Sequence, residues 1–171
     1  MALKIGTTIG MLHPRHFLEV VLAAERLGYE SLWMPELLVL PESMAGSPFG
    51  AAEYPQLPPQ TPLFDALTYL AFFAGQTSRI RLGTNVYLLG LRHPFVAARA
   101  IQTLDFVSGG RAEVGVGAGW LRSEWRATGL DPATRGRRLD EALIVCKRLW
   151  REERIAHDGE YYLFETVCFE P

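Results

Sequence analysis

Ala112-Glu113-Val114-Gly115-Val116-Gly117-Ala118-Gly119-Trp120 (residues 112–120) is the stretch on which the fold assignment depends. Its first five residues are mostly apolar and predict a short buried strand, and glycine recurs at alternate positions as that strand ends. Because Gly115, Gly117 and Gly119 carry no side chain, they leave backbone that a flat ring system can approach closely and hydrogen-bond. The alternative is that these glycines only relieve crowding where strands converge.

Three further short apolar runs precede this strand, and stretches with a helical period separate them. The predicted strands are residues 5–9, 31–34, 80–87 and 112–116, the predicted helices are 17–27, 62–76, 94–107 and 135–150, and a hairpin follows with strands 154–157 and 161–164 around an Asp158-Gly159 turn. Strict alternation of strands and helices predicts a parallel α/β sheet covered by helices. Both an open doubly wound sheet and part of a TIM-type (β/α)8 barrel have this order.

The open sheet predicts a dinucleotide-binding fingerprint, Gly-x-Gly-x-x-Gly, directly after its first strand. Here that place holds Gly6-Thr7-Thr8-Ile9-Gly10, which lacks the spacing. The later glycine run also fails, because Trp120 and Arg122 stand where a third glycine of the fingerprint is needed. A nicotinamide-binding fold is therefore disfavoured.

Composition excludes several classes of protein. The chain has 171 residues, 49% of them hydrophobic, so it carries enough apolar material to fold. Its 17 basic residues face 19 acidic ones, which argues against a nucleic-acid partner. Cys146 and Cys168 are far apart, so neither a disulfide framework nor a metal site is expected. The longest apolar run, residues 69–74, is too short for a bilayer, and we expect a soluble, cytoplasmic protein.

An ordered set of motifs resembles the bacterial luciferase-like monooxygenase superfamily, and most of all its coenzyme F420-dependent branch. The motifs are Leu82-Gly83-Thr84-Asn85-Val86, Arg92-His93-Pro94, Leu104-Asp105-Phe106-Val107-Ser108-Gly109-Gly110-Arg111, Gly115-Val116-Gly117-Ala118-Gly119-Trp120, Glu124, Gly129, Arg135-Gly136-Arg137-Arg138, Asp140-Glu141, Leu149-Trp150 and Asp158-Gly159-Glu160-Tyr161-Tyr162. They cover nearly the whole chain, and their order is far more specific than any single motif.

The resemblance implies a TIM-type barrel that binds coenzyme F420, our first choice, or FMN at the carboxyl ends of its strands. In such proteins the third strand often ends in a bulge with a non-prolyl cis peptide behind the cofactor ring, and Asn85-Val86 occupies that place. The loop of Gly117, Ala118, Gly119 and Trp120 would lie along the cofactor. The implied activity is hydride transfer between the cofactor and a small organic substrate.

Two residues are candidate proton donors or acceptors because they follow predicted strands: His13 after the first and Glu36 after the second. The alternative for each is an ordinary residue of a solvated loop. Asp65, near the start of a predicted helix, is expected to be structural. Glu124 and the Asp140-Glu141 pair are expected to be helix-surface or salt-bridging residues.

Two features bear on the substrate. Relatives that oxidise sugar phosphates carry an acidic residue after the last glycine of the run, whereas this chain has Trp120, which argues against that substrate and could stack on a ring or cover the barrel rim. A long connection, residues 37–61, is predicted to be a lid. Its Phe49, Tyr54 and Leu57 favour an apolar ligand.

Length is the last constraint, because a complete (β/α)8 barrel takes about 250 residues. We therefore expect residues 1–171 to form a single domain with the first four βα units, incomplete at its C-terminus and without the family's later phosphate-binding loops. Open sheet edges would need cover. A second copy of the chain, a missing C-terminal half, or the C-terminal hairpin folded over one edge would supply it. The alternative function is a non-catalytic flavin-binding or structural half-barrel.

Overall fold

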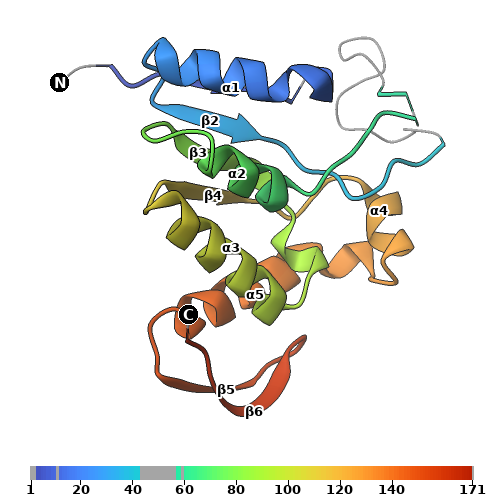
Figure 1. Ribbon diagram of the computed structural model, residues 1–171. Helices are drawn as coiled ribbons and strands as arrows, with labels where there is room; N and C mark the ends of the chain where they lie inside the picture. The colour runs from blue at the N-terminus through green and yellow to red at the C-terminus, as the bar shows by residue number, and fades with distance from the viewer. Residues whose placement is uncertain (1–2, 11, 43–56, 59, 171) are drawn as a thin grey trace.

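The computed structural model describes residues 3–10, 12–42, 57–58 and 60–170. Strands and helices alternate along most of this chain, and a separate hairpin follows (Figure 1). The strands are β1 (Gly6–Thr8), β2 (Ser31–Met34), β3 (Arg81–Tyr87), β4 (Ala112–Val116), β5 (Arg154–Asp158) and β6 (Leu163–Cys168). The α-helices are α1 (Phe17–Arg26), α2 (Ala66–Ala74), α3 (Pro94–Ser108), α4 (Arg122–Ala127) and α5 (Arg135–Leu149).

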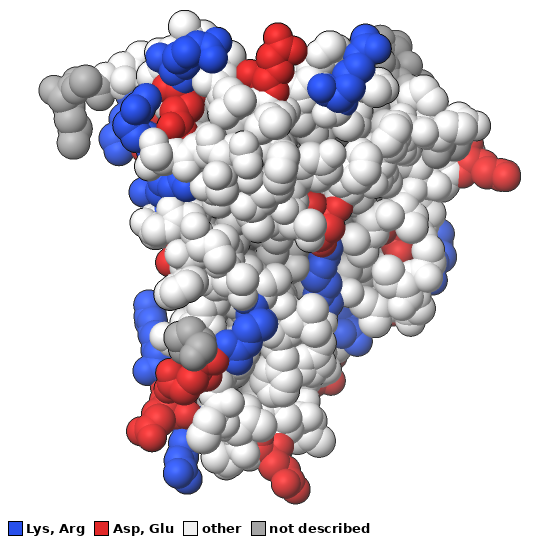
Figure 2. Space-filling view, in the orientation of Figure 1, with Lys and Arg blue, Asp and Glu red and all other residues white. Residues whose placement is uncertain are grey.

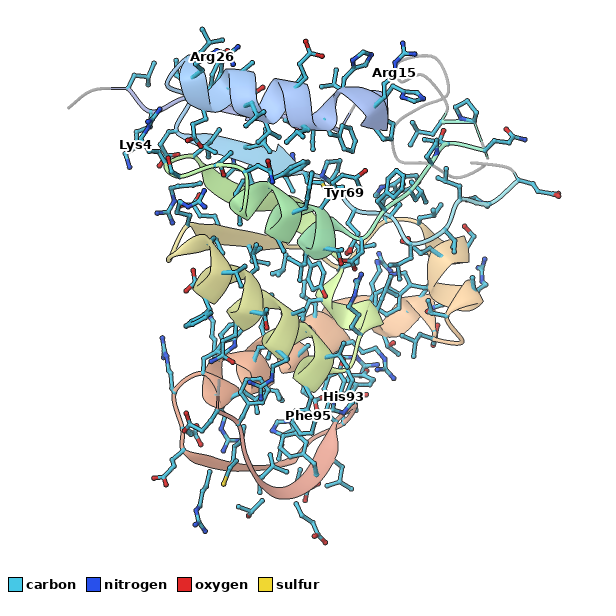
Figure 3. All side chains as sticks on the ribbon, viewed as in Figure 1. Lys4, Arg15, Arg26, Tyr69, His93 and Phe95 are labelled. Atoms are coloured by element: carbon cyan, nitrogen blue, oxygen red, sulfur yellow. The ribbon has the colours of Figure 1, made fainter. Side chains whose placement is uncertain are left out.

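The main sheet decides between the two architectures left open by the sequence. Its strands are all parallel and lie in the simple order β1-β2-β3-β4, without the reversal of order that a doubly wound sheet has. Helix α1 contacts α2 through the Phe17 and Tyr69 rings, 5.5 Å apart, and α2 packs against α3, so these helices cover one face of the sheet (Figures 1 and 3). Consecutive order with helices on one face is the geometry of a TIM-type barrel, of which four units are present.

The opposite face of the sheet is organised around the indole ring of Trp33 on β2. A Cβ atom built on Gly83 of β3 would lie 2.5 Å from this ring, and one on Gly6 of β1 would lie 2.9 Å from its Nε1 atom. The ring is held in place because Nε1 donates a hydrogen bond to Ser31 Oγ (3.0 Å). Gly115 of β4 lacks a side chain for a different reason, since a Cβ there would lie 2.5 Å from the Thr84 carbonyl oxygen. These glycines therefore serve close packing inside the barrel.

Helix α2 begins four residues later than the sequence period predicts. Asp65 adopts extended backbone and caps the helix, with Oδ1 accepting a hydrogen bond from the Thr68 amide (2.8 Å). An N-cap carboxylate satisfies an amide that has no partner within the helix. The structural role expected for Asp65 is confirmed, and Pro62 lies before the helix.

The structure differs from the sequence-based prediction at two further places. Helix α4 was missed, because its six residues are too few to show a period. In the hairpin, β6 begins at Leu163, paired with Asp158, where a strand from Tyr161 was predicted. The amides of Tyr161 and Tyr162 are taken by the Glu141 carboxylate, at 3.0 and 2.9 Å, so neither donates to the strand ladder. The salt-bridging role predicted for Glu141 is confirmed by its 3.0 Å contact with His157 Nε2.

Parts of the predicted lid, including Phe49 and Tyr54, lie outside the described residues. Within the described ranges, no helix is both long enough and apolar enough to cross a membrane.

The hairpin is tied to α5 by Glu141, so its stability is expected to depend on pH. Burial by itself raises the pKa of Glu141, but hydrogen bonds from Tyr162, His157 and Tyr161 outweigh it, and the net pKa is lowered from 4.5. A carboxylate with a lowered folded pKa stabilises the fold above the unfolded pKa, and this contribution is lost as pH falls through the folded value.

We expect Glu141→Ala to lower the free energy of unfolding by about 1–3 kcal/mol at neutral pH, measured by urea denaturation. The deficit relative to wild type should shrink below pH 4.5, as the wild-type carboxylate becomes protonated. Glu160→Ala is the matched control, because its pair with Arg137 is exposed and is worth only about 0–1 kcal/mol. Equal losses in the two variants would contradict the anchoring role.

Candidate functional site

A cavity of about 580 Å³ opens where β1, β2 and β3 end. Backbone and side chains from the carboxyl ends of these strands line it, together with the segment that leads into α2. Parallel strands bring their carboxyl ends to the same edge, which is where α/β barrels place their sites. The cavity brings together three of the residues singled out from the sequence: His13, Glu36 and Asn85.

His13 is exposed at the rim of this cavity, directly after β1. Its Nδ1 atom accepts a hydrogen bond from the Arg15 amide (3.3 Å) and caps the short 3₁₀ turn Pro14–His16. This bond orients the ring and leaves Nε2 as the nitrogen that can reach a ligand. Figure 3 shows Arg15 at the N-terminal end of α1.

Glu36 is neither a solvated loop residue nor an open carboxylate. Its side chain is fully buried and forms a two-pronged ion pair with Arg92, with distances of 2.6 Å (Nη2 to Oε1) and 3.0 Å (Nη1 to Oε2). The Leu88 amide donates to Oε2 as well (2.8 Å). Burial raises the pKa of Glu36, while the Leu88 amide and the Arg92 charge oppose that rise. With three donors on two oxygens, the carboxylate ties the end of β2 to the chain that follows β3.

Arg92 extends this network in two directions. Its guanidinium lies 4.3 Å from the centre of the buried Tyr87 ring, and Nη2 also contacts Asp65 Oδ2 at 3.5 Å. Asp65 therefore caps α2 and contacts the same guanidinium that neutralises Glu36. Burial also raises the pKa of Tyr87, which keeps the phenol neutral.

The end of β3 has the unusual geometry that the resemblance implied. The Asn85-Val86 peptide bond is cis, and the register with β4 slips by one residue between Thr84 and Tyr87. Asn85 and Val86 are both exposed. A Cβ atom on Gly117 would lie 2.4 Å from Val86 Cγ2, so the glycine allows Val86 to lie against the end of β4.

The rest of the glycine loop packs on helix α4. Trp125 is fully buried, and its Nε1 atom donates to the Ala118 carbonyl oxygen (3.1 Å). Gly119 has a φ of +71°, a left-handed conformation that favours glycine. Trp120 is half-buried and does not belong to the described residues that line the cavity. The predicted contacts of Gly117, Ala118, Gly119 and Trp120 with a cofactor stay predictions.

Glu124 is a correction to the sequence analysis, which expected a helix-surface or salt-bridging residue. Its side chain is fully buried, and Oε1 accepts a hydrogen bond from the Leu38 amide, 86 residues away in the chain. Oε2 has no hydrogen-bond partner within the described residues. Burial raises the pKa of Glu124, and the Leu38 and Val39 amides oppose the rise. The carboxyl group fastens the segment after β2 to α4, and no local pattern could have revealed this contact.

Charge is sparse around the cavity. On the face seen in Figure 2, lysine, arginine and acidic side chains stand singly or in small groups of both signs, with no broad patch of one sign. Across the described ranges, no group of three His, Cys, Asp or Glu side chains lies close enough to hold a metal ion.

The fold is half of a TIM-type barrel, with a cavity at the carboxyl ends of its strands. Residues 4–171 match the family model described as luciferase-like monooxygenase, so the chain belongs to this family of flavin- and F420-dependent oxidoreductases.

Two named relatives agree with this membership, and one solved structure shows the same fold. An F420-dependent glucose-6-phosphate dehydrogenase from Kineococcus radiotolerans is 44% identical over 57% of this chain and 30% of its own length. The 4-hydroxyprotoasukamycin monooxygenase of Streptomyces nodosus subsp. asukaensis is 41% identical over 77% of this chain and 31% of its own. The oxygenating component of 3,6-diketocamphane monooxygenase from Pseudomonas putida, solved with FMN, superposes with a TM-score of 0.75 at 21% identity, over 100% of this chain and 44% of its own. The chain thus spans less than half the length of each.

The buried pair of Glu36 and Arg92 should be far more important for stability than the exposed pairs. Arg92→Ala leaves a buried carboxylate without its cation, and we expect it to lower the free energy of unfolding by about 3–5 kcal/mol in urea titrations. Arg137→Ala, which breaks an exposed pair, should cost about 0–1 kcal/mol. Adding Glu36→Gln to Arg92→Ala should recover part of the loss, and strictly additive effects would contradict the coupling.

The contribution of Glu124 to the free energy of unfolding should depend on pH in the opposite direction to that of Glu141. Because its folded pKa lies above 4.5, stability is highest where the carboxyl is neutral and falls as pH rises through the folded value. Glu124→Gln keeps an acceptor for the Leu38 amide without the charge. We therefore expect it to be at least as stable as wild type at pH 8, whereas Glu124→Ala should lose about 1–3 kcal/mol. A Gln variant as unstable as the Ala variant would refute this account.

Proposed function

We propose that the chain belongs to an oxidoreductase that binds coenzyme F420, or else FMN, and acts on a small organic substrate in the cavity at the strand ends. The observation that supports this most directly is the end of β3, where the register with β4 slips by one residue and Val86 lies against Gly117. Membership of the family supplies the reaction class.

The residues at the ends of β3 and β4 fit the ring of such a cofactor. Val86 is 39% exposed and packs against Gly117. Together the two residues present a flat apolar surface against which a ring can lie. When bound, a flavin or deazaflavin would accept a hydride from a substrate carbon or donate one to it. These residues fit the ring of the cofactor but not its phosphate. The described residues that line the cavity include no lysine or arginine to hold a phosphate.

Of the two proposed proton carriers, His13 is the one placed to meet a substrate. Its Nε2 atom is oriented by the bond at Nδ1, and the ring stands at the cavity rim. The Glu36 carboxylate is fully buried with its oxygens bound to Arg92 and Leu88, so we propose that it positions the strand ends around the site.

Titration of the chain with F420 and with FMN, followed by cofactor fluorescence, tests the proposal. Saturable one-to-one binding of either cofactor is expected, with F420 the tighter. Binding of neither would refute the function for this chain and favour the non-catalytic half-barrel.

The same titration can locate the ring. Gly117→Ala places a methyl group against Val86, which must then shift, and we expect cofactor binding to weaken by about tenfold. Gly136→Ala is the matched control: nothing lies within 4 Å of a Cβ there, so affinity should not change. Unchanged affinity in Gly117→Ala would place the ring elsewhere.

A further inference from the structure

The cavity at the strand ends is large enough for a whole small molecule. Its volume of about 580 Å³ falls in the usual range for ligand sites, about 300–1,000 Å³. Apolar side chains dominate the lining, among them Leu12, Phe17 and Phe64. Leu12 and Phe64 are 39% and 42% exposed, so they present apolar surface that a ligand can cover.

The described lining of the cavity offers no lysine or arginine side chain to an anionic ligand. The described residues that line it include no lysine, arginine or aspartate, and one glutamate, Glu36. That carboxylate is already neutralised by Arg92, whose own guanidinium is held by Glu36 and Asp65 and is 14% exposed. A phosphate or carboxylate placed here would lose its hydration without gaining a cation, and this costs free energy.

The other polar residues of the described lining include His13, Thr61 and Asn85, each of which carries hydrogen-bonding groups. Thr8 is already committed, since Oγ1 donates to the Trp33 carbonyl (3.0 Å) and accepts from the Gly10 amide (3.2 Å). This set suits one hydroxyl or carbonyl group on an otherwise apolar molecule.

We infer that the substrate of this site is an uncharged, mainly apolar molecule carrying a hydroxyl or carbonyl group, and that phosphorylated or carboxylated compounds are excluded. The inference rests on the proposed function for its reaction, while the selectivity follows from the cavity alone. One of the relatives is named as a glucose-6-phosphate dehydrogenase. The substrate class inferred here therefore separates this chain from that relative.

A matched pair of probes tests the selectivity without any cofactor: 1-naphthol and 1-naphthyl phosphate, which share one apolar body. Saturation-transfer NMR and fluorescence titration of the chain should show naphthol binding about tenfold more tightly. Equal affinity, tighter binding of the phosphate, or binding of neither probe would overturn the inference. Because no cofactor is present, each of these results is independent of the F420 and FMN titrations.

A positive charge introduced at one position should reduce the preference for naphthol over its phosphate. Leu12→Lys adds a cation to the lining, and we expect it to strengthen binding of 1-naphthyl phosphate by about three- to fivefold and not to strengthen naphthol binding. Leu163→Lys is the control, because Leu163 is 74% exposed on β6 and does not line the cavity. A gain in phosphate binding cannot come from a damaged fold. The same gain in both variants, or none in Leu12→Lys, would overturn the inference.

Discussion

The buried ion pair between Glu36 and Arg92 is the constraint on which the geometry of the strand ends depends. It joins the residue after β2 to the segment after β3, and its guanidinium reaches on to the cap of α2 at Asp65. An ion pair of this kind needs several hydrogen bonds to offset the loss of hydration, and here the Leu88 amide provides one of them. The result is a rigid base beneath the cavity, made by residues that a ligand does not need to touch.

Carboxylates that hold backbone amides recur through the molecule. Glu36 binds the Leu88 amide, Glu124 binds that of Leu38, and Glu141 binds those of Tyr161 and Tyr162. Glu124 and Glu141 fasten segments without regular structure to helices α4 and α5, and Glu36 joins the segments that follow β2 and β3. The loops around the barrel mouth and the hairpin are therefore held by specific hydrogen bonds, and the hairpin also adds Ile155, Tyr162 and Phe169 to the apolar core.

Much of the fold could be predicted from the sequence because the spacing of apolar residues within each segment indicates whether it forms a strand or a helix. The four strands, the major helices and their order follow from apolar spacing, and the place of the cis Asn85-Val86 bond follows from a family resemblance. The misses depend on contacts that join distant parts of the chain. Glu124 looks like a surface residue until the Leu38 amide is brought to it, and β6 begins two residues later than predicted because Glu141 binds the amides of Tyr161 and Tyr162. Such contacts have no signature in neighbouring residues.

The packing of Trp33 against glycines also has a consequence for how such a chain can evolve. The indole occupies space that side chains on Gly6 of β1 and Gly83 of β3 would need, so one large residue on the middle strand is matched by absent side chains on both neighbours. A smaller residue at position 33 would leave a void, and a larger one at either glycine would collide with the ring. Substitutions at these three positions should therefore be accepted together more readily than singly, and natural variation across the inside of the barrel should be correlated between strands.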